Sequence, residues 1–149
     1  MSFLTTKNPF SKSDPGSTDS LDQPDQERHS ENQGLPNGQW IPPVDVLESR
    51  AAYWFKADLP GLKASDVRVV RIKETLLISG ERNLGSRLGI LRQERPRGYF
   101  LRRLPLPDDA SRQQITAKLS QGVLEVTARK LSDNYESDYP ETLEIGIGE

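Results

Sequence analysis

The sequence of 149 residues contains no cysteine and only one histidine, His29. The absence of cysteine excludes disulfide frameworks, zinc sites built on cysteine and catalysis by a thiol. Because His29 lies in a polar stretch, no histidine is left as the base of a Ser–His–Asp arrangement in a folded domain. The sequence also has no G-x-x-x-x-G-K phosphate-binding loop. We therefore predict no catalytic residues, no metal and no cofactor.

Long hydrophobic runs are also missing. No apolar stretch approaches the length that spans a bilayer, and the first residues lack the apolar core of a secretory signal. The hydrophobic fraction of 34% and the mean hydropathy of -0.68 indicate that part of the chain is not packed. The net charge of -2 gives no global field that would attract nucleic acid or a membrane. We expect a soluble, cytoplasmic protein with no membrane partner and no nucleic-acid partner.

The first zone of the chain, residues 1–39, is dominated by Ser, Asp, Gln, Asn, Pro and Gly from residue 11 onward. Such a segment cannot bury enough apolar surface to offset its ordering entropy. We predict a disordered, polar N-terminal arm. Its apolar residues lie near its start, as Phe3, Leu4 and Phe10. They are either a loose end or a small adhesive patch for other proteins.

The second zone, residues 40–130, consists of short strand-like segments separated by turn residues about every ten positions, which indicates an all-β sandwich. The expected strands are 41–48, 52–58, 67–72, 75–80, 98–107, 115–119 and 123–127. Only 63–66 and 109–114 have a helix-like pattern. The long connection 81–97 is unusual in so small a domain, and such loops are usually functional.

The third zone, residues 131–149, is acidic and extended, and carries Ile145 and Ile147 close to its end. In an extended segment two residues two positions apart point to the same face. The pair is either part of a frayed terminus or a strand that adds to the edge of a sheet. The fifteen residues from Lys130 to Ile145 can span ~50 Å, enough to reach a neighbouring molecule.

Seven motifs in the middle zone, taken in order and spacing, resemble the α-crystallin domain of the small heat shock proteins. They are WIPPVDVLE (40–48), ADLPG (57–61), LISGER (77–82), ER (94–95), GYFLR (98–102), LP (106–107) and AKLSQGVL (117–124). The tail adds the I-x-I motif of that family. The turn at 59–61 and the long connection resemble the bacterial and plant branch. The polar arm departs from the family, whose arms usually carry many apolar residues.

The resemblance implies an immunoglobulin-like sandwich with a disordered arm and an extended tail. It also implies a dimer in which a short strand of the long connection, here 88–92, pairs with the partner's sheet. On this basis the dimer-interface residues are Leu88, Ile90, Leu91, Arg92 and Arg102. Arg102 is expected to pair with an acid across the dimer.

The resemblance further implies that Ile145 and Ile147 dock in an edge groove of another dimer and build larger oligomers. By strand position, the groove residues are Val67, Val69, Ile115, Ala117 and Leu119. Burial of two isoleucines contributes at most ~3–6 kcal/mol before ordering costs, so the contact is reversible.

The implied function is that of an ATP-independent holdase, whose partners are unfolding client proteins and further copies of itself. Phe3, Leu4 and Phe10 are the candidate client contacts in the arm. One alternative is a co-chaperone of the p23-like type, which shares the sandwich but has neither the I-x-I tail nor the exchange loop. Another is a nucleic-acid binder that uses the arginines between 82 and 103. We favour an interface role for these arginines, because arginine is preferred for ion pairs between proteins.

Overall fold

The computed structural model describes residues 40–149, except 84, 86–87 and 134–135. Phe3, Leu4 and Phe10 therefore lie outside the described residues. Those described contain nine strands and one short 3-10 helix, η2, so the expected all-β fold is confirmed. The strands are β1 (Val44–Glu48), β2 (Ala52–Asp58), β3 (Val67–Ile72), β4 (Thr75–Arg82), β5 (Gly98–Pro105), β6 (Ala110–Ser120), β7 (Val123–Lys130), β8 (Thr142–Ile145) and β9 (Ile147–Gly148), and η2 is Ala64–Asp66.

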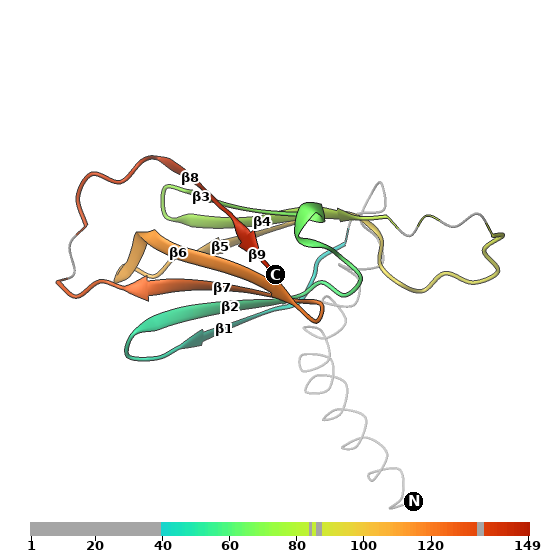
Figure 1. The fold of residues 1–149 in the computed structure, drawn as a ribbon, viewed down its shortest axis with the longest axis horizontal. Coiled ribbons are helices and arrows are strands. Elements are labelled where there is room, and N and C mark those ends of the chain that lie inside the picture. The colour runs from blue at the N-terminus through green and yellow to red at the C-terminus, as the bar shows by residue number, and fades with distance from the viewer. Residues whose placement is uncertain (1–39, 84, 86–87, 134–135) are drawn as a thin grey trace, which may run out of the picture. The chain divides into compact units, whose positions relative to one another are not determined.

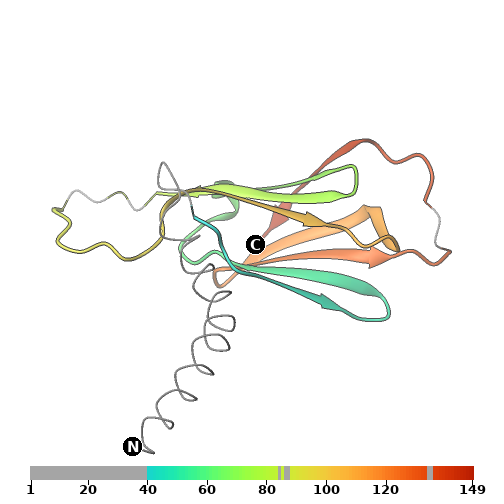
Figure 2. The same cartoon turned by 180° about the vertical axis from the view of Figure 1, so that it is seen from behind.

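Two sheets pack face to face, as Figures 1 and 2 show from opposite sides. One sheet has the strand order β1-β2-β7-β6-β9 and the other has the order β5-β4-β3-β8. All pairs are antiparallel except β6 with β9, which run parallel. The short strands β8 and β9 come from the C-terminal tail, and each extends a different sheet.

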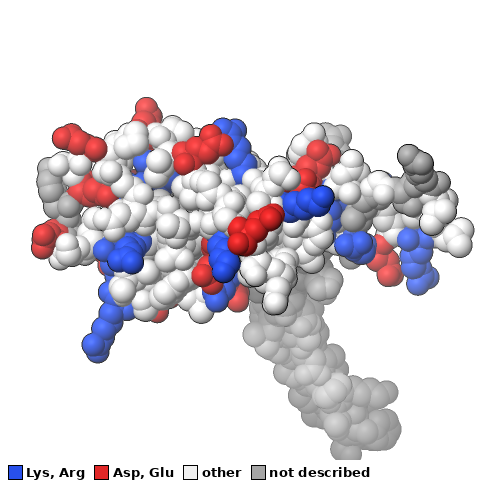
Figure 3. Space-filling view, viewed as in Figure 1, with Lys and Arg blue, Asp and Glu red and all other residues white. Residues whose placement is uncertain are grey.

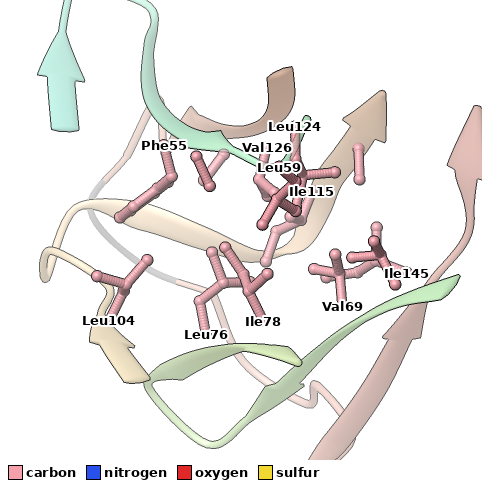
Figure 4. Close-up of a cluster of buried hydrophobic side chains, with 14 of the residues drawn as sticks. Phe55, Leu59, Val69, Leu76, Ile78, Leu104, Ile115, Leu124, Val126 and Ile145 are labelled. Carbon is pink, nitrogen blue, oxygen red and sulfur yellow. The ribbon is translucent and has the colours of Figure 1, made fainter. Parts of the chain in front are cut away.

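The core lies between the sheets and is made by alternate side chains of each strand. In β2, for example, Phe55 and Ala57 are buried whereas Lys56 and Asp58 between and after them are exposed. Figure 4 shows Phe55 in a row from one sheet, facing Leu76 and Ile78 of the other. Alternation of apolar and polar residues therefore divides each strand into a core face and a solvent face.

Tight turns fall where the sequence predicted them. The hairpin between β6 and β7 has two residues, Gln121 and Gly122, with φ of 52° and 78°. Positive φ at both positions defines a type I′ turn, whose twist matches that of the flanking strands. The helix-like pattern at 109–114 was misleading, because residues 110–114 belong to β6 and the chain is extended there.

The edges of the sheets are paired on one side of the sandwich and unpaired on the other. On one side the outer strands of the body, β3 and β6, are covered by β8 and β9. On the opposite side β1 and β5 are the edge strands, and no strand of the described residues pairs with their outer edges. The described part of the long connection between β4 and β5 projects beyond one end of the sandwich, past the ends of these two strands (Figures 1 and 2).

Gly80 lies in β4 at a point where the backbone approaches the neighbouring chain closely. A Cβ added there would lie 2.7 Å from the ring Cζ of Phe100 and would also clash with the backbone oxygen of Asp66. We expect Gly80→Ala to lower the free energy of unfolding by about 1–3 kcal/mol, the usual cost of overpacking. Denaturant unfolding measures this. Gly89→Ala is the control, because nothing lies within 4 Å of the added carbon; equal stabilities for the two variants would contradict the packing argument.

Candidate functional site

The C-terminal strands lie between β3 and β6, in a channel that we call the tail groove. Its walls come from the inward faces of these two strands, which belong to different sheets. All five residues that the sequence assigned to a groove are on these strands and are buried: Val67, Val69, Ile115, Ala117 and Leu119. Beside the tail there remains a hollow, lined in part by Val67, Val69 and Ile145.

The two tail isoleucines occupy different parts of the tail groove. Ile145 lies opposite Val69 in the antiparallel β3–β8 pair and is only 6% exposed. Figure 4 shows the two side chains next to each other at the end of the core. Ile147 lies beside Ala117 in the parallel β6–β9 pair and is half-buried. The tail therefore contacts both sheets of the sandwich.

Exposed polar contacts flank the isoleucines. The Nε of Arg68 donates to Oε1 of Glu144 at 3.1 Å and its Nη2 donates to Oε2 at 3.4 Å. Both side chains are 65% exposed, so this ion pair contributes little net stability. The backbone N–H of Ala64 donates to Oε1 of Glu149 at 3.2 Å, near the end of the chain. These contacts therefore add little to the free energy of tail binding, although they favour one orientation of the tail.

Arg71 is the largest fully buried side chain of the described residues, and its guanidinium forms no ion pair with any described carboxylate. Its Nε donates to the carbonyl of Arg112 at 2.8 Å, and its Nη1 donates to the carbonyl of Lys73 at 3.1 Å. Two further acceptors belong to the tail. Nη1 donates to the carbonyl of Glu141 at 3.2 Å and Nη2 donates to that of Pro140 at 2.8 Å.

Burial lowers the pKa of the Arg71 guanidinium below its usual value, an effect that nearby Tyr139 partly opposes. The tyrosine ring centroid is 5.3 Å from the guanidinium carbon, a cation–π distance. Sequence reasoning missed Arg71, although a signal was present. Alternation along 67–72 places position 71 on the same inward face as Val67 and Val69. Burial of an arginine there costs free energy unless hydrogen-bond acceptors surround its guanidinium.

A second tail contact lies at the start of β6. The carboxylate of Glu136 accepts two hydrogen bonds. Ser111 Oγ donates to its Oε1 at 2.8 Å, and the backbone N–H of Arg112 donates to its Oε2. Ser111 Oγ itself accepts the backbone N–H groups of Gln113 and Gln114 at 3.1 and 2.9 Å, which leaves its proton directed to Glu136. Because 109–114 was expected to be helix-like, this contact at the start of β6 was not predicted from the sequence.

The apolar and polar contacts of the tail are of similar strength. Burying an isoleucine side chain contributes about 1.5–3 kcal/mol. A hydrogen bond to a charged group contributes about 1.5–3 kcal/mol, and Arg71 makes two such bonds to the tail. The ordering of the tail backbone opposes both. The segment before Ile145 therefore holds the tail as much as the isoleucines do.

The residues assigned to the dimer interface lie in the long connection and on β5. Residues 88–92 form no strand in the single chain, and Leu88, Ile90 and Leu91 are exposed. Arg102, on β5, is half-buried and donates to the carbonyl of Pro42 at 2.9 Å within its own chain. Further exposed apolar side chains belong to the edge strands β1 and β5: Val46, Leu47, Tyr99 and Leu101.

Arg82 and Trp40 contact each other and the end of the long connection next to β5. The guanidinium carbon of Arg82 lies 4.1 Å from the centroid of the Trp40 ring, and its Nη1 donates to the carbonyl of Pro96 at 3.1 Å. Trp40 Nε1 donates to the carbonyl of Gly98 at 3.1 Å. Burial, and secondarily Arg95, lowers the pKa of Arg82. Arg82 is therefore buried in the fold and is unavailable to a nucleic acid.

Other chemistries find no support in the described part of the chain. It contains no group of three or more side chains that could hold a metal ion. None of its helices is long and apolar enough to cross a membrane. On the face shown in Figure 3, acidic and basic side chains are interspersed, so no single-sign field covers it.

Comparison with known proteins identifies the same architecture. The model of the Hsp20/alpha crystallin family matches residues 45–145. The 17.0 kDa class II heat shock protein of Zea mays is 43% identical over 108 residues, 70% of each chain. The 17.7 kDa class II heat shock protein of Arabidopsis thaliana is 34% identical over 110 residues, again 70% of each chain.

Two bacterial structures are similar to the chain in both fold and sequence. The small heat-shock protein of Xylella fastidiosa, described as having a distinct high order structure, superposes with a TM-score of 0.59 and 37% identity, covering 72% of this chain and 98% of that one. The hspA of Xanthomonas axonopodis has a TM-score of 0.57 and 41% identity, covering 62% of this chain and 95% of that one.

The unequal burial of the isoleucines predicts unequal roles. Ile145→Ala should raise the hydrogen-exchange rates of the β8 amides by about tenfold or more, because each 1.4 kcal/mol of lost docking is a factor of ten. Ile147→Ala should have a smaller effect, since its side chain is only half-buried. Exchange mass spectrometry measures both, with the amides of β4 and β5 as the unchanged reference. Equal effects of the two substitutions would show that the burial difference does not govern docking.

Proposed function

This chain belongs to the Hsp20/alpha crystallin family of small heat shock proteins, and we propose that it is an ATP-independent holdase. The family and the relatives support a stress-related chaperone role. The proposed activity is to bind partly unfolded proteins and prevent their aggregation under heat or other stress. It involves no reaction and no cofactor, and we propose that it takes place in the cytoplasm.

The tail groove carries this proposal. It accepts an extended segment by backbone pairing on β3 and β6 and by apolar contacts to alternate residues of that segment. Partly unfolded proteins expose segments of this kind, which otherwise pair with one another and aggregate. Backbone pairing is independent of sequence, so such a groove suits many different clients.

We propose that heat loosens the tail and shifts the population toward molecules with a free groove. The vacated edges of β3 and β6 then hold the client. Phe3, Leu4 and Phe10 of the arm are proposed as additional client contacts. In this scheme residues 1–39 act as a disordered arm, 40–130 as the α-crystallin domain and 131–149 as the flexible extension that occupies or vacates the groove.

We further propose that two chains form a dimer on the β1/β5 side. Residues 88–92 would pair with the partner's edge, and the contact would be reciprocal. The exposure of Ile90, Leu91 and Val46 supports this, because exposed apolar side chains at an unpaired strand edge are typical of an interface. Docking of tails in the grooves of other dimers would build larger oligomers.

The holdase proposal predicts that the chain suppresses light scattering by a heat-labile client without ATP. At equal mass, scattering should fall several-fold relative to the client with an unrelated folded protein. If a folded sample of this chain has no effect on several clients, the general holdase proposal is wrong. A dedicated p23-like partner-binding role would then be the better explanation of the same sandwich.

The dimer proposal predicts that Leu91→Asp raises the dissociation constant of the dimer by about tenfold or more, because it places a charge in an apolar contact. Arg102→Ala should also weaken the dimer. Analytical ultracentrifugation over a range of concentrations measures both. Gly85→Asp, which adds the same charge to the same connection outside 88–92, is the control. A dimer equally stable in Leu91→Asp and Gly85→Asp would exclude the connection from the interface.

A further inference from the structure

The outer face of the four-stranded sheet carries apolar side chains that the tail groove does not use. Because Ile78 of β4 and Phe100 of β5 point into the core, alternate residues of the strands in this sheet point outward. The large apolar residues among them, which we call the outer patch, are Val70, Ile72, Leu77, Tyr99 and Leu101. Tyr99 is 60% exposed, and Ile72 and Leu101 are both 39% exposed. In the part of the chain that the structure describes, no third layer of strands covers the outer patch.

The outer face of the other sheet is more polar in its middle. One row across β2, β7 and β6 consists of charged residues, namely Lys56, Glu125 and Lys118, and Lys56 Nζ lies 3.3 Å from Oε2 of Glu125. The next row consists of Trp54, Thr127 and Thr116. A sheet that faces water normally places polar residues outward, and the outer patch departs from this rule. A contiguous exposed apolar surface of this kind indicates an interaction site.

Charges of opposite sign lie at the two ends of one row of the outer patch. The strand register across β5, β4, β3 and β8 places side by side Arg103, Leu77, Val70 and Glu144. The row is the same whichever copy of the chain supplies β8. Three strand spacings separate Arg103 from Glu144 by ~14 Å, too far for an ion pair along the row. Glu144 is 65% exposed despite its pair with Arg68, so a further cation can approach its carboxylate.

We propose that the outer patch binds the outer patch of a second copy of this chain, face to face. A two-fold axis parallel to the strands, between β3 and β4, lays the row over the same row of the partner in reverse order. Arg103 then lies opposite the partner's Glu144, and Leu77 lies opposite the partner's Val70. Unlike charges meet at both ends and apolar side chains meet in the middle, as suits the aligned packing of two sheets. The row is therefore complementary to its own copy.

The size of this contact makes it weak on its own. Four strands of about six residues cover roughly 19 by 20 Å of sheet, or about 400 Å² per partner. A stable, specific interface usually buries ~800 Å² per partner. The contact leaves residues 88–92 and the edge of β1 free, so it joins dimers of the proposed kind into rings or chains. Several such contacts acting together bind more tightly than one. The contact is thus an addition to the proposed dimer and tail contacts and requires neither of them.

The charged ends of the row allow a direct test with the full-length chain. Arg103→Lys keeps the charge and adds an amine, which a zero-length carbodiimide reagent joins to a carboxylate in contact with it. Position 103 and a Glu144 on the same sheet are ~14 Å apart, beyond the reach of this reagent, whichever copy supplies the tail. Unlabelled and isotope-labelled protein are mixed, treated and digested, and the joined peptides are identified by mass spectrometry. We expect position 103 joined to Glu144, with mixed-isotope and single-isotope pairs in equal amounts, as pairing between molecules requires.

Leu77→Asp places a charge in the middle of the outer patch. In the Arg103→Lys protein it should lower the yield of the joined pair by about tenfold, and the mean mass in sedimentation should fall. Thr127→Asp is the matched control, because Thr127 lies on the outer face of the other sheet. It should leave the yield and the mass unchanged. Lys56 and Glu125, 3.3 Å apart within the sandwich, give a joined pair that reports a folded domain in every variant.

Ile72→Asp provides a second variant at a more exposed position of the outer patch, and it should lower the yield in the same direction as Leu77→Asp. Absence of the joined pair from the Arg103→Lys protein, or its presence only as single-isotope pairs, would overturn the proposal. So would equal yields in the two patch variants and in Thr127→Asp. Client aggregation is a separate readout, so the face-to-face contact can be wrong while the holdase activity holds, and the reverse.

Discussion

The edges of two small sheets impose the constraint on which the rest of this structure depends. An unpaired edge presents N–H and C=O groups that pair with any available strand, including one from another molecule. On one side of the sandwich the chain covers the edges of β3 and β6 with its own tail. On the other side β1 and β5 carry exposed apolar residues, which is why that side suits a partner. The tail thus covers the edges on one side, and in the proposed dimer the long connection of a partner would cover an edge on the other side.

If the groove holds clients as proposed, the tail that covers β3 and β6 has to be removable, and this would explain its mixture of apolar and polar contacts. An apolar tail alone would bind in any register that buries two isoleucines. The carbonyls of Pro140 and Glu141 on Arg71 fix the register, because a buried guanidinium tolerates few arrangements of acceptors.

Much of this architecture follows from the alternation of apolar and polar residues. The strands, the turn at Gln121 and the groove residues Val67 and Val69 could all be placed from the sequence, since each depends on local pattern. Arg71 could not, because its acceptors are backbone carbonyls that every residue has and that no side-chain pattern reveals. Nor does the sequence of the tail distinguish its own groove from another molecule's.

Under the proposed holdase function, the contacts of the linker would determine how a client competes for the groove. A segment held next to its site acts at an effective concentration that reaches about the millimolar range for a short tether. A client at far lower concentration gains access only if it binds much more tightly or if the tail is first displaced. Heat favours displacement, because release of an ordered segment gains conformational entropy. Since Arg71 loses acceptors when residues 140–141 leave, release of the linker and exposure of the buried charge are coupled. In the proposed mechanism, the groove would therefore open together with the release of residues 140–141, and not by the release of one isoleucine at a time.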